Sequence, residues 1–176
     1  MDKVLLDKAK NIKLLLLDVD GVLTDGSIVY DDKGVETKSF SVRDGHGITM
    51  LQRSGVECGI ITARTSKVLL KRCDDLSIKL VYQGAKKKAE AFEDVLSKTG
   101  LNSSEIAYIG DDLVDLPVLR RVGLSATVSD GVEEVKDEVD FISSKQGGGG
   151  AVRELVELIL KSNGRWKEVT SRYYEG

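Results

Sequence analysis

The sequence contains two cysteines, one histidine and one proline in 176 residues. Cys58 and Cys73 stand far apart and form no CxxC pair, which is typical of reduced thiols in a core. His46 has no partner at ligand spacing, so we interpret it as an ordinary surface or core residue. No apolar run approaches the length that spans a membrane. The first residues, MDKVLLD, lack the apolar segment of a signal peptide.

The sequence also lacks an excess of basic residues. Its 26 Lys and Arg against 29 Asp and Glu give a formal net charge of -3, whereas nucleic-acid binding usually requires a basic excess. The hydrophobic content of 41% is enough to close a core, and the length fits one domain over residues 1–176. We therefore expect a soluble, cytoplasmic, globular protein with neither a nucleic-acid nor a membrane partner.

Short apolar runs alternate with helical segments along the chain. We predict strands at residues 12–17, 57–62, 78–82, 106–109, 124–126 and 141–142, and helices at 45–53, 66–75, 85–99, 113–122 and 151–160. Residues 26–42 are predicted to form a hairpin around the turn Asp31–Gly34, and residues 162–176 form a polar, aromatic tail. The alternation predicts an α/β fold with a central parallel sheet between two layers of helices.

Polar residues follow four of the predicted strands, where ligands bind in parallel sheets. In chain order they are Asp18 and Asp20; Thr62 and Arg64; Lys86, Lys87 and Lys88; and Gly110, Asp111, Asp112 and Asp115. If the sheet is parallel, all of them converge on one edge. Each also has an ordinary explanation, because threonine can cap a helix and acidic residues are favoured in a first helical turn.

Two of these features are less ordinary. Three lysines in a first helical turn oppose the helix dipole, and a local rule broken in this way tends to mark function. Gly147 to Gly150 could be a plain flexible loop, but they open a helix whose backbone N–H groups can hold an anion. The strand-end features together are far more specific than any one of them.

Their chemistry fits phosphoryl transfer. Carboxylates from two strand ends can hold Mg²⁺ through hard oxygen ligands, and metal, lysine and threonine together can neutralise the oxygens of a phosphoryl group. One aspartate can attack phosphorus and form an aspartyl-phosphate. The second can protonate the leaving oxygen and later activate water. Asp18 and Asp20 suit these two roles, since residues two apart on a strand point the same way.

The order D-x-D-G-x-x-T-D, strand-end Thr, Lys and G-D-D-x-x-D resembles the haloacid dehalogenase superfamily over nearly the whole chain. The resemblance implies a Rossmann-like fold, with Asp18 as nucleophile and Asp20 as acid and base. It implies that Thr62 and Lys88 bind phosphate, and Lys88 is preferred over its two neighbours only by its place in the family pattern. It also implies Mg²⁺ held by the Asp18 carboxylate, the Asp20 backbone carbonyl and Asp111.

A closer resemblance is to the 3-deoxy-D-manno-octulosonate 8-phosphate phosphatases, which serve lipopolysaccharide precursor synthesis. The matching segments are LLLLDVDGVLTDG, FSVRDGHGI, YQGAKKK, AYIGDDLVDLPVL, RVGLS and GGGGAVREL. The family's substrate contacts fall on Asp20, Ser41, Val42, Arg43, Asp44, Gly45, Thr49, Arg64, Arg72 and Lys88. Gly149 stands where the family often has Arg and where a 2-keto-3-deoxynononate 9-phosphate phosphatase has Glu, which keeps the longer sugar acid as an alternative. The segment TAR replaces the more usual TGR.

No cap domain is expected over the site. The first position for a cap holds only the hairpin, and the second, Gln83-Gly84, holds almost nothing. A small substrate would then lie open to water, which weakens electrostatic contacts. Either the substrate is large, or a neighbouring subunit supplies the lid. The resemblance implies a homotetramer in which hairpins assemble together and a neighbour's tail approaches each site.

Two other classes of protein share parts of this pattern. A two-component receiver domain also uses paired acids, Thr and Lys, but its phosphoacceptor follows a later strand and DxDG is absent. The C-terminal domain of vertebrate sialic-acid activating enzymes has this fold with degraded motifs and serves assembly. All motif positions are filled here, which favours a phosphatase over such a non-catalytic assembly domain.

Overall fold

The computed structural model describes residues 2–174, and its main sheet has six parallel strands. They are β1 (Leu14–Leu17), β4 (Glu57–Ile61), β5 (Leu80–Tyr82), β6 (Ile106–Ile109), β7 (Leu124–Thr127) and β8 (Phe141–Ile142). The spatial order is β5-β4-β1-β6-β7-β8. The predicted parallel sheet is therefore confirmed, and the end of β1 lies near its centre.

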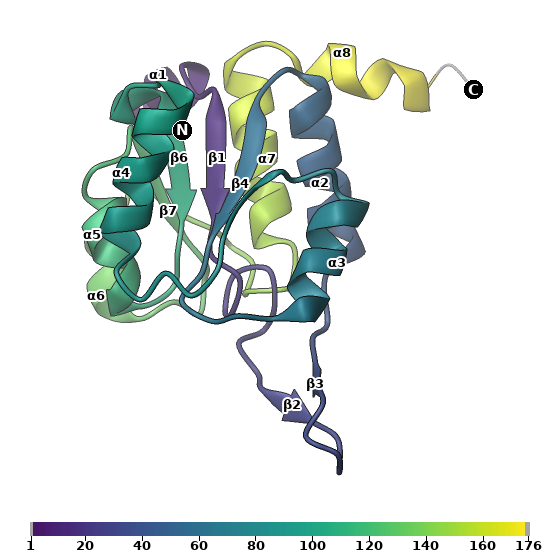
Figure 1. The fold of residues 1–176 in the computed structure, drawn as a ribbon. Helices are drawn as coiled ribbons and strands as arrows, with labels where there is room; N and C mark the ends of the chain where they lie inside the picture. Colours follow the sequence, from purple (N-terminus) through teal and green to yellow (C-terminus); the bar gives the residue numbers. More distant parts are fainter. Residues whose placement is uncertain (1, 175–176) are drawn as a thin grey trace.

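Helices cover both faces of the sheet (Figure 1). One face carries α1 (Lys3–Lys10), α2 (Val42–Arg53), α3 (Lys67–Asp75) and α7 (Ala151–Ser162), and the other carries α4 (Lys88–Thr99), α5 (Leu116–Leu119) and α6 (Glu133–Lys136). Leu15 and Leu17 enter the first core, whereas Leu14 and Leu16 enter the second, because successive strand side chains point to opposite faces. Four fully buried leucines thus hold β1 between the two layers.

The hairpin consists of β2 (Val29–Tyr30) and β3 (Glu36–Thr37), and it projects from the end of the sheet toward which the strand arrows point (Figure 1). In its turn, the Asp31 carboxylate accepts hydrogen bonds from two backbone N–H groups at 2.8 and 2.9 Å. The strands are shorter than predicted. The chain leaves the second strand early because Ser41 caps α2, which begins three residues before the predicted start.

Several short helices were not predicted. α1 begins after Asp2, whose side chain accepts a hydrogen bond from Val4 N at 3.0 Å, and α6 is a single turn. The predicted helix 113–122 is instead a 3₁₀ turn, η2 (Leu113–Asp115), followed by α5, and two more 3₁₀ turns are η1 (Ser103–Glu105) and η3 (Ser171–Tyr173). These elements are too short for a helical period to show in the sequence.

The C-terminal segment folds against its own chain as far as the structure describes it. α8 (Trp166–Thr170) lies at the end of the molecule opposite the hairpin (Figure 1), and Val169 belongs to the core. Arg53 Nη1 donates to the Tyr173 hydroxyl at 2.8 Å, and His46 Nε2 lies 2.9 Å from the same oxygen. The segment 162–174 is therefore a docked element, and the sole histidine helps to hold it.

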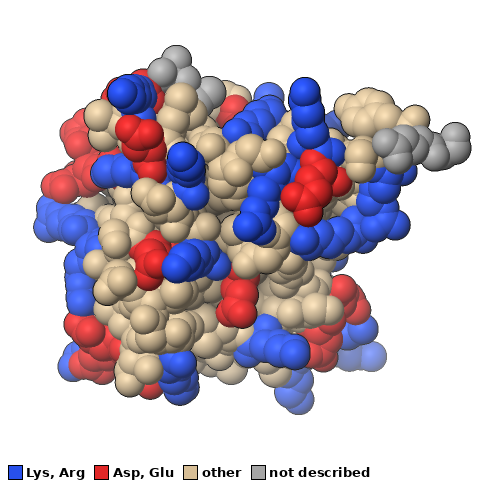
Figure 2. Space-filling model, turned by 90° about the horizontal axis from the view of Figure 1, so that it is seen from above, with Lys and Arg blue, Asp and Glu red and all other residues tan. Residues whose placement is uncertain are grey.

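The surface at that end carries lysine, arginine and acidic side chains interspersed rather than one charged patch (Figure 2). Cys58 and Cys73 are buried and unpaired, which confirms the prediction of thiols in the core. None of the helices formed by residues 2–174 is long and apolar enough to cross a membrane.

Two loops at the carboxyl ends of the strands touch through their backbones. A Cβ on Gly147 would lie 1.9 Å from the Gly21 carbonyl oxygen, and one on Gly148 would lie 2.8 Å from the carbonyl carbon of Thr24. Glycine at these positions lets the loop before α7 lie directly on the loop after β1.

We predict that Gly147→Ala lowers the free energy of unfolding by about 1–3 kcal/mol, the usual cost of overpacking. Gly149→Ala is the matched control, since its Cβ would meet nothing closer than the Gln146 carbonyl oxygen at 3.1 Å. Urea unfolding of both variants measures the difference. Equal stabilities would contradict the close contact.

Candidate active site

Asp18 follows β1 directly and is held from three directions. Its backbone N–H donates to the Ile109 carbonyl at 3.0 Å, and its Oδ1 accepts from Val19 N at 2.7 Å. Its Oδ2 lies 2.8 Å from Lys88 Nζ. Burial raises the pKa of Asp18 to about 6, against the lowering effect of Lys88. The Asp18 carboxylate is thus fixed in place, with its Oδ2 in contact with the Lys88 ammonium.

Lys88 is the lysine of the KKK segment that enters the site. It begins α4 and is 2% exposed, whereas Lys86 and Lys87 are exposed. Its ammonium donates to Asp115 Oδ1 at 2.6 Å and to the Tyr108 hydroxyl at 3.2 Å. Burial lowers the pKa of Lys88, but the charges of the two aspartates outweigh burial and raise it. Packing thus singles out one of three adjacent lysines.

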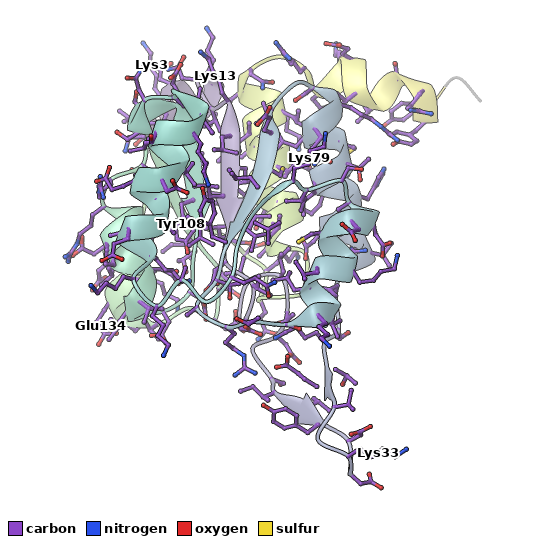
Figure 3. All side chains as sticks on the ribbon, viewed as in Figure 1. Lys3, Lys13, Lys33, Lys79, Tyr108 and Glu134 are labelled. Atoms are coloured by element: carbon purple, nitrogen blue, oxygen red, sulfur yellow. The ribbon has the colours of Figure 1, made fainter. Side chains whose placement is uncertain are left out.

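Asp115 is a fully buried carboxylate that organises the loop after β6. Its Oδ2 accepts from the backbone N–H groups of Asp111 at 3.0 Å and Asp112 at 3.2 Å, and its Oδ1 also accepts from Tyr108. Figure 3 shows Tyr108 between the sheet and the helices on one side of it. Asp112 is exposed and caps η2.

Three carboxylates gather where β1 and β6 end. Asp18, Asp111 and Asp115 each offer an oxygen, and these oxygens lie within 4.8 Å of one another. The pKa of Asp111 is raised to about 7 by burial and then by the charges of Asp18 and Asp115. Like charges held this close are stabilised by a divalent cation. A Cβ on Gly21 (φ +89°) would lie 2.0 Å from Asp111 Oδ2, so glycine lets the two loops meet.

The donor set fits Mg²⁺, which prefers oxygen ligands and uses one or two carboxylates. Each oxygen of Asp115 accepts two hydrogen bonds, whereas each oxygen of Asp18 has one partner and the Asp111 carboxylate accepts none from residues 2–174. Asp18 and Asp111 are therefore the carboxylates with capacity left for a metal. The backbone carbonyl of Asp20 accepts no hydrogen bond within residues 2–174. The fit agrees with the ligand set that the sequence resemblance implies.

The Asp20 carboxylate turns away from this group. Its Oδ1 pairs with Lys38 and its Oδ2 lies 3.7 Å from Arg64 Nε. Glu36 pairs with Arg64 and lies 3.6 Å from Lys38 Nζ. Sequence reasoning missed Glu36 and Lys38. The alternating charges of the segment ETK were a usable signal, but we interpreted this strand only as a packing surface.

Thr62 is buried at the end of β4. Its Oγ1 accepts from the backbone N–H of Arg64 at 3.4 Å, and its hydroxyl donates to no group of the described chain. The hydroxyl proton therefore remains available to a ligand.

The predicted substrate residues at the start of α2 form a separate group. Arg72 Nη2 donates to the Ser41 carbonyl at 3.2 Å and lies so close to Gly45 that a Cβ there would be 2.2 Å away. Val42 and Arg43 are exposed. Thr49 bonds within its own helix, to the Gly45 carbonyl at 3.1 Å. Within residues 2–174 these are the only hydrogen bonds that the side chains of Arg72 and Thr49 make, so the structure does not join them to the strand-end carboxylates.

Asp44 lies at the N-terminus of α7, where the sequence indicates that backbone N–H groups can hold an anion. The side chain is 1% exposed and accepts from Gly150 N at 3.2 Å and Arg153 N at 2.8 Å. Burial raises the pKa of Asp44, and these bonds oppose the rise. Asp44 thus occupies two N–H groups at the start of α7 and ties α2 to the glycine loop.

Comparisons with known proteins agree with this geometry. Residues 77–155 match the haloacid dehalogenase-like hydrolase family. The 3-deoxy-D-manno-octulosonate 8-phosphate phosphatase KdsC of Escherichia coli K12 is 45% identical over 161 residues, which are 92% of this chain and 86% of that protein.

Solved structures share the fold at similar identity. A 3-deoxy-D-manno-octulosonate 8-phosphate phosphatase from Moraxella catarrhalis, in complex with magnesium, phosphate and KDO, is 42% identical with a TM-score of 0.95 over 98% of this chain and 99% of that one. The cobalt-bound form of a deoxy-D-mannose-octulosonate 8-phosphate phosphatase from Haemophilus influenzae is 41% identical, with a TM-score of 0.90 over 96% of this chain and 99% of that one.

We predict that, without metal, Asp111→Asn stabilises the protein increasingly as pH rises. The folded protein holds a proton on Asp111 up to about pH 7, whereas an aspartate carboxyl with its ordinary pKa loses it near 3.8. The raised pKa contributes stability below pH 3.8, and this contribution is lost as pH rises to about 7. Above pH 7 the free energy of unfolding of the variant should exceed that of the wild type by on the order of 1 kcal/mol, which raises Tm by about 2–4 °C.

Thermal unfolding in chelator from pH 4 to 8 measures this difference. Adding Mg²⁺ should stabilise the wild type and not the variant, and Asp112→Asn, a change at an exposed cap, should show neither effect. A difference that does not grow between pH 4 and 7 would refute the assignment.

Proposed function

The chain belongs to the 3-deoxy-D-manno-octulosonate 8-phosphate phosphatases among the haloacid dehalogenase-like hydrolases, and we propose that it hydrolyses this phosphomonoester to KDO and inorganic phosphate. The observation that carries the proposal is the separation of the two carboxylates after β1. Asp18 faces Lys88 and the acidic group, whereas Asp20 faces Lys38 and Arg64. Two carboxylates in different surroundings can take different roles in one reaction.

In the proposed reaction, Asp18 attacks phosphorus and the bond from phosphorus to the sugar oxygen breaks. Asp20 gives its proton to that oxygen, so the sugar acid leaves neutral at the new hydroxyl. Asp20 then takes a proton from water, which attacks the aspartyl-phosphate, releases phosphate and restores Asp18. Lys88 holds Asp18 in line for the attack, and the free hydroxyl of Thr62 donates to a phosphate oxygen.

Mg²⁺ bound to Asp18, Asp111 and the Asp20 carbonyl would supply positive charge to the phosphate oxygens. The structure of the Moraxella catarrhalis relative with magnesium, phosphate and KDO supports this choice of metal. Asp115 acts on the site by holding Lys88 and the Asp111 backbone in place.

The sugar acid is proposed to contact the remaining predicted residues. Arg64 is 38% exposed at its side chain and stands beside Asp20, where a guanidinium can bind a carboxylate or phosphate. Arg72 and the segment Ser41–Gly45 would contact the sugar, together with Thr49. Gly149 adds no charge, so Arg64 is the cation beside Asp20 that recognises the anionic substrate.

We further propose that residues 1–176 act as one domain within a homotetramer built through the hairpins. Within the described chain, the only insert between β1 and α2 is the hairpin, which exposes a run of apolar residues: Ile28, Val29, Tyr30 and Val35, each 51–58% exposed. Such residues favour burial against another copy. A cytoplasmic location stays a prediction from the sequence.

We predict that Asp18→Asn abolishes phosphate release from 3-deoxy-D-manno-octulosonate 8-phosphate while the protein stays folded, because an amide cannot serve as the acceptor. Wild-type release should require Mg²⁺ and stop in excess chelator. A phosphate-release assay over a panel that includes the nononate 9-phosphate tests the substrate, with thermal unfolding as the control for folding. Substantial turnover by folded Asp18→Asn would contradict the mechanism. If the wild type preferred the nononate 9-phosphate, that longer sugar acid phosphate would be assigned as the substrate instead.

We predict that Val29→Lys breaks the tetramer, since it places charge on an exposed apolar strand of the hairpin. Light scattering at working concentration should report tetramers for the wild type and smaller species for the variant. Lys3→Met, on a helix at the opposite end of the molecule, is the control (Figure 3). A wild-type monomer with full activity would defeat the assembly proposal.

A further inference from the structure

Lys38 is a lysine with an almost completely buried side chain at the base of the hairpin. The side chain is 2% exposed, while the Asp20 side chain beside it is 20% exposed. Lysine is rarely buried this far unless it is paired, because removing an ammonium ion from water is costly. The pairing with Asp20 is therefore the interaction that keeps Lys38 in place.

The same pairing is the only direct hydrogen bond that any group of residues 2–174 donates to the Asp20 carboxylate. Arg64 Nε points toward Asp20 but stays at 3.7 Å, and this buried nitrogen has no hydrogen-bond partner among the described residues. Asp18, by contrast, is oriented by a backbone N–H group and by Lys88. Each of the two carboxylates therefore has its own buried lysine.

Glu36 fixes Lys38 from the other side. It lies 3.6 Å from Lys38 Nζ and pairs with Arg64, so the four groups form a closed ring of alternating charge. The ring joins the hairpin to the loop after β1 and to the loop after β4. With Asp20 ionised the ring has no net charge, and Lys38 is paired with the carboxylates on either side of it, Asp20 and Glu36.

We propose that Lys38 is a positioning residue for Asp20, and that the hairpin serves each site by delivering this lysine. The inference rests on the proposed function in assigning proton transfer to Asp20. Lys38 holds the Asp20 carboxylate at the angle from which it meets the leaving oxygen. Without the contact to Lys38, the Asp20 carboxylate can rotate. The rate of proton transfer to the leaving oxygen then falls, whereas the binding of phosphate does not change.

The test is the dependence of kcat/KM on the leaving group, because a general acid matters most when the leaving group is poor. Lys38→Met removes the charge and keeps most of the side-chain volume. With 3-deoxy-D-manno-octulosonate 8-phosphate, a sugar alcohol leaving group, we expect kcat/KM to fall by about 10- to 100-fold, a part of the 10²–10⁴ that general acids contribute. With p-nitrophenyl phosphate, whose leaving group needs no proton, we expect a change below about threefold.

Two controls separate positioning from other roles. Lys33→Met removes a lysine at the tip of the same hairpin (Figure 3) and should leave both rates unchanged. The inhibition constant of inorganic phosphate reports anion binding and should change by less than about threefold in Lys38→Met. Lys38→Arg keeps a cation beside Asp20 and should recover most of the lost rate. If the Met variant does not fold, Lys38→Gln is measured in the same way.

Three results would overturn the proposal. Equal losses with both substrates would mean that Lys38 only supports the fold. Weaker inhibition by phosphate with kcat unchanged would make Lys38 a substrate-binding residue. If the wild type hydrolyses p-nitrophenyl phosphate but not the sugar phosphate, the substrate assignment fails. Lys38 is then tested with a series of aryl phosphates whose leaving groups differ in pKa. A wild type that is inactive on every phosphomonoester overturns both the proposed function and the role of Lys38.

Discussion

The structure depends on one buried ammonium group between two buried carboxylates. Lys88 Nζ lies 2.8 Å from Asp18 Oδ2 and 2.6 Å from Asp115 Oδ1. Removing one partner of such a group leaves an uncompensated buried charge, which costs on the order of 3–5 kcal/mol. The triad therefore ties the end of β1, the start of α4 and the loop after β6 to one another, and it fixes the place where a metal and a phosphate can bind.

The same constraint explains why acidic residues near each other differ in role. Both oxygens of Asp115 accept hydrogen bonds, from Lys88, Tyr108 and backbone N–H groups, so Asp115 orders the loop after β6. The Asp111 carboxylate accepts no hydrogen bond from the described residues, and burial, followed by the charges of Asp18 and Asp115, raises its pKa to about 7. Two carboxylates four residues apart thus differ in their surroundings, because the described residues donate hydrogen bonds to Asp115 and none to Asp111.

Around this centre, the remaining loops are held by backbone contacts and by charge. Gly147 meets the backbone of Gly21, and Asp44 binds the first N–H groups of α7. The hairpin is attached by the ring of Asp20, Lys38, Glu36 and Arg64. A site without a cap domain can be preorganised in this way, since its side chains are oriented by rigid neighbours rather than by a closing lid.

The sequence by itself determined the order of the six parallel strands and of the longer helices α2, α3, α4 and α7, together with the polar residues that follow the strands. Four leucines before Asp18 indicate a strand buried on both faces, and Asp18, Thr62, Lys88 and Asp111 follow such strands in a motif order that identifies the family. These features are local, because periodicity and turn residues are written in neighbouring positions.

Only the tertiary structure decided which of several chemically equivalent residues are buried at the strand ends and which partners they contact. It selected Lys88 from three adjacent lysines, separated Asp115 from Asp111, directed Asp44 onto α7 and brought Lys38 from the hairpin to Asp20. Each of these choices depends on contacts between segments far apart in the chain. The sequence does not distinguish a solvated charged residue from a buried one. Only packing determines how far such a residue is buried and which partners it contacts, and these give it its role.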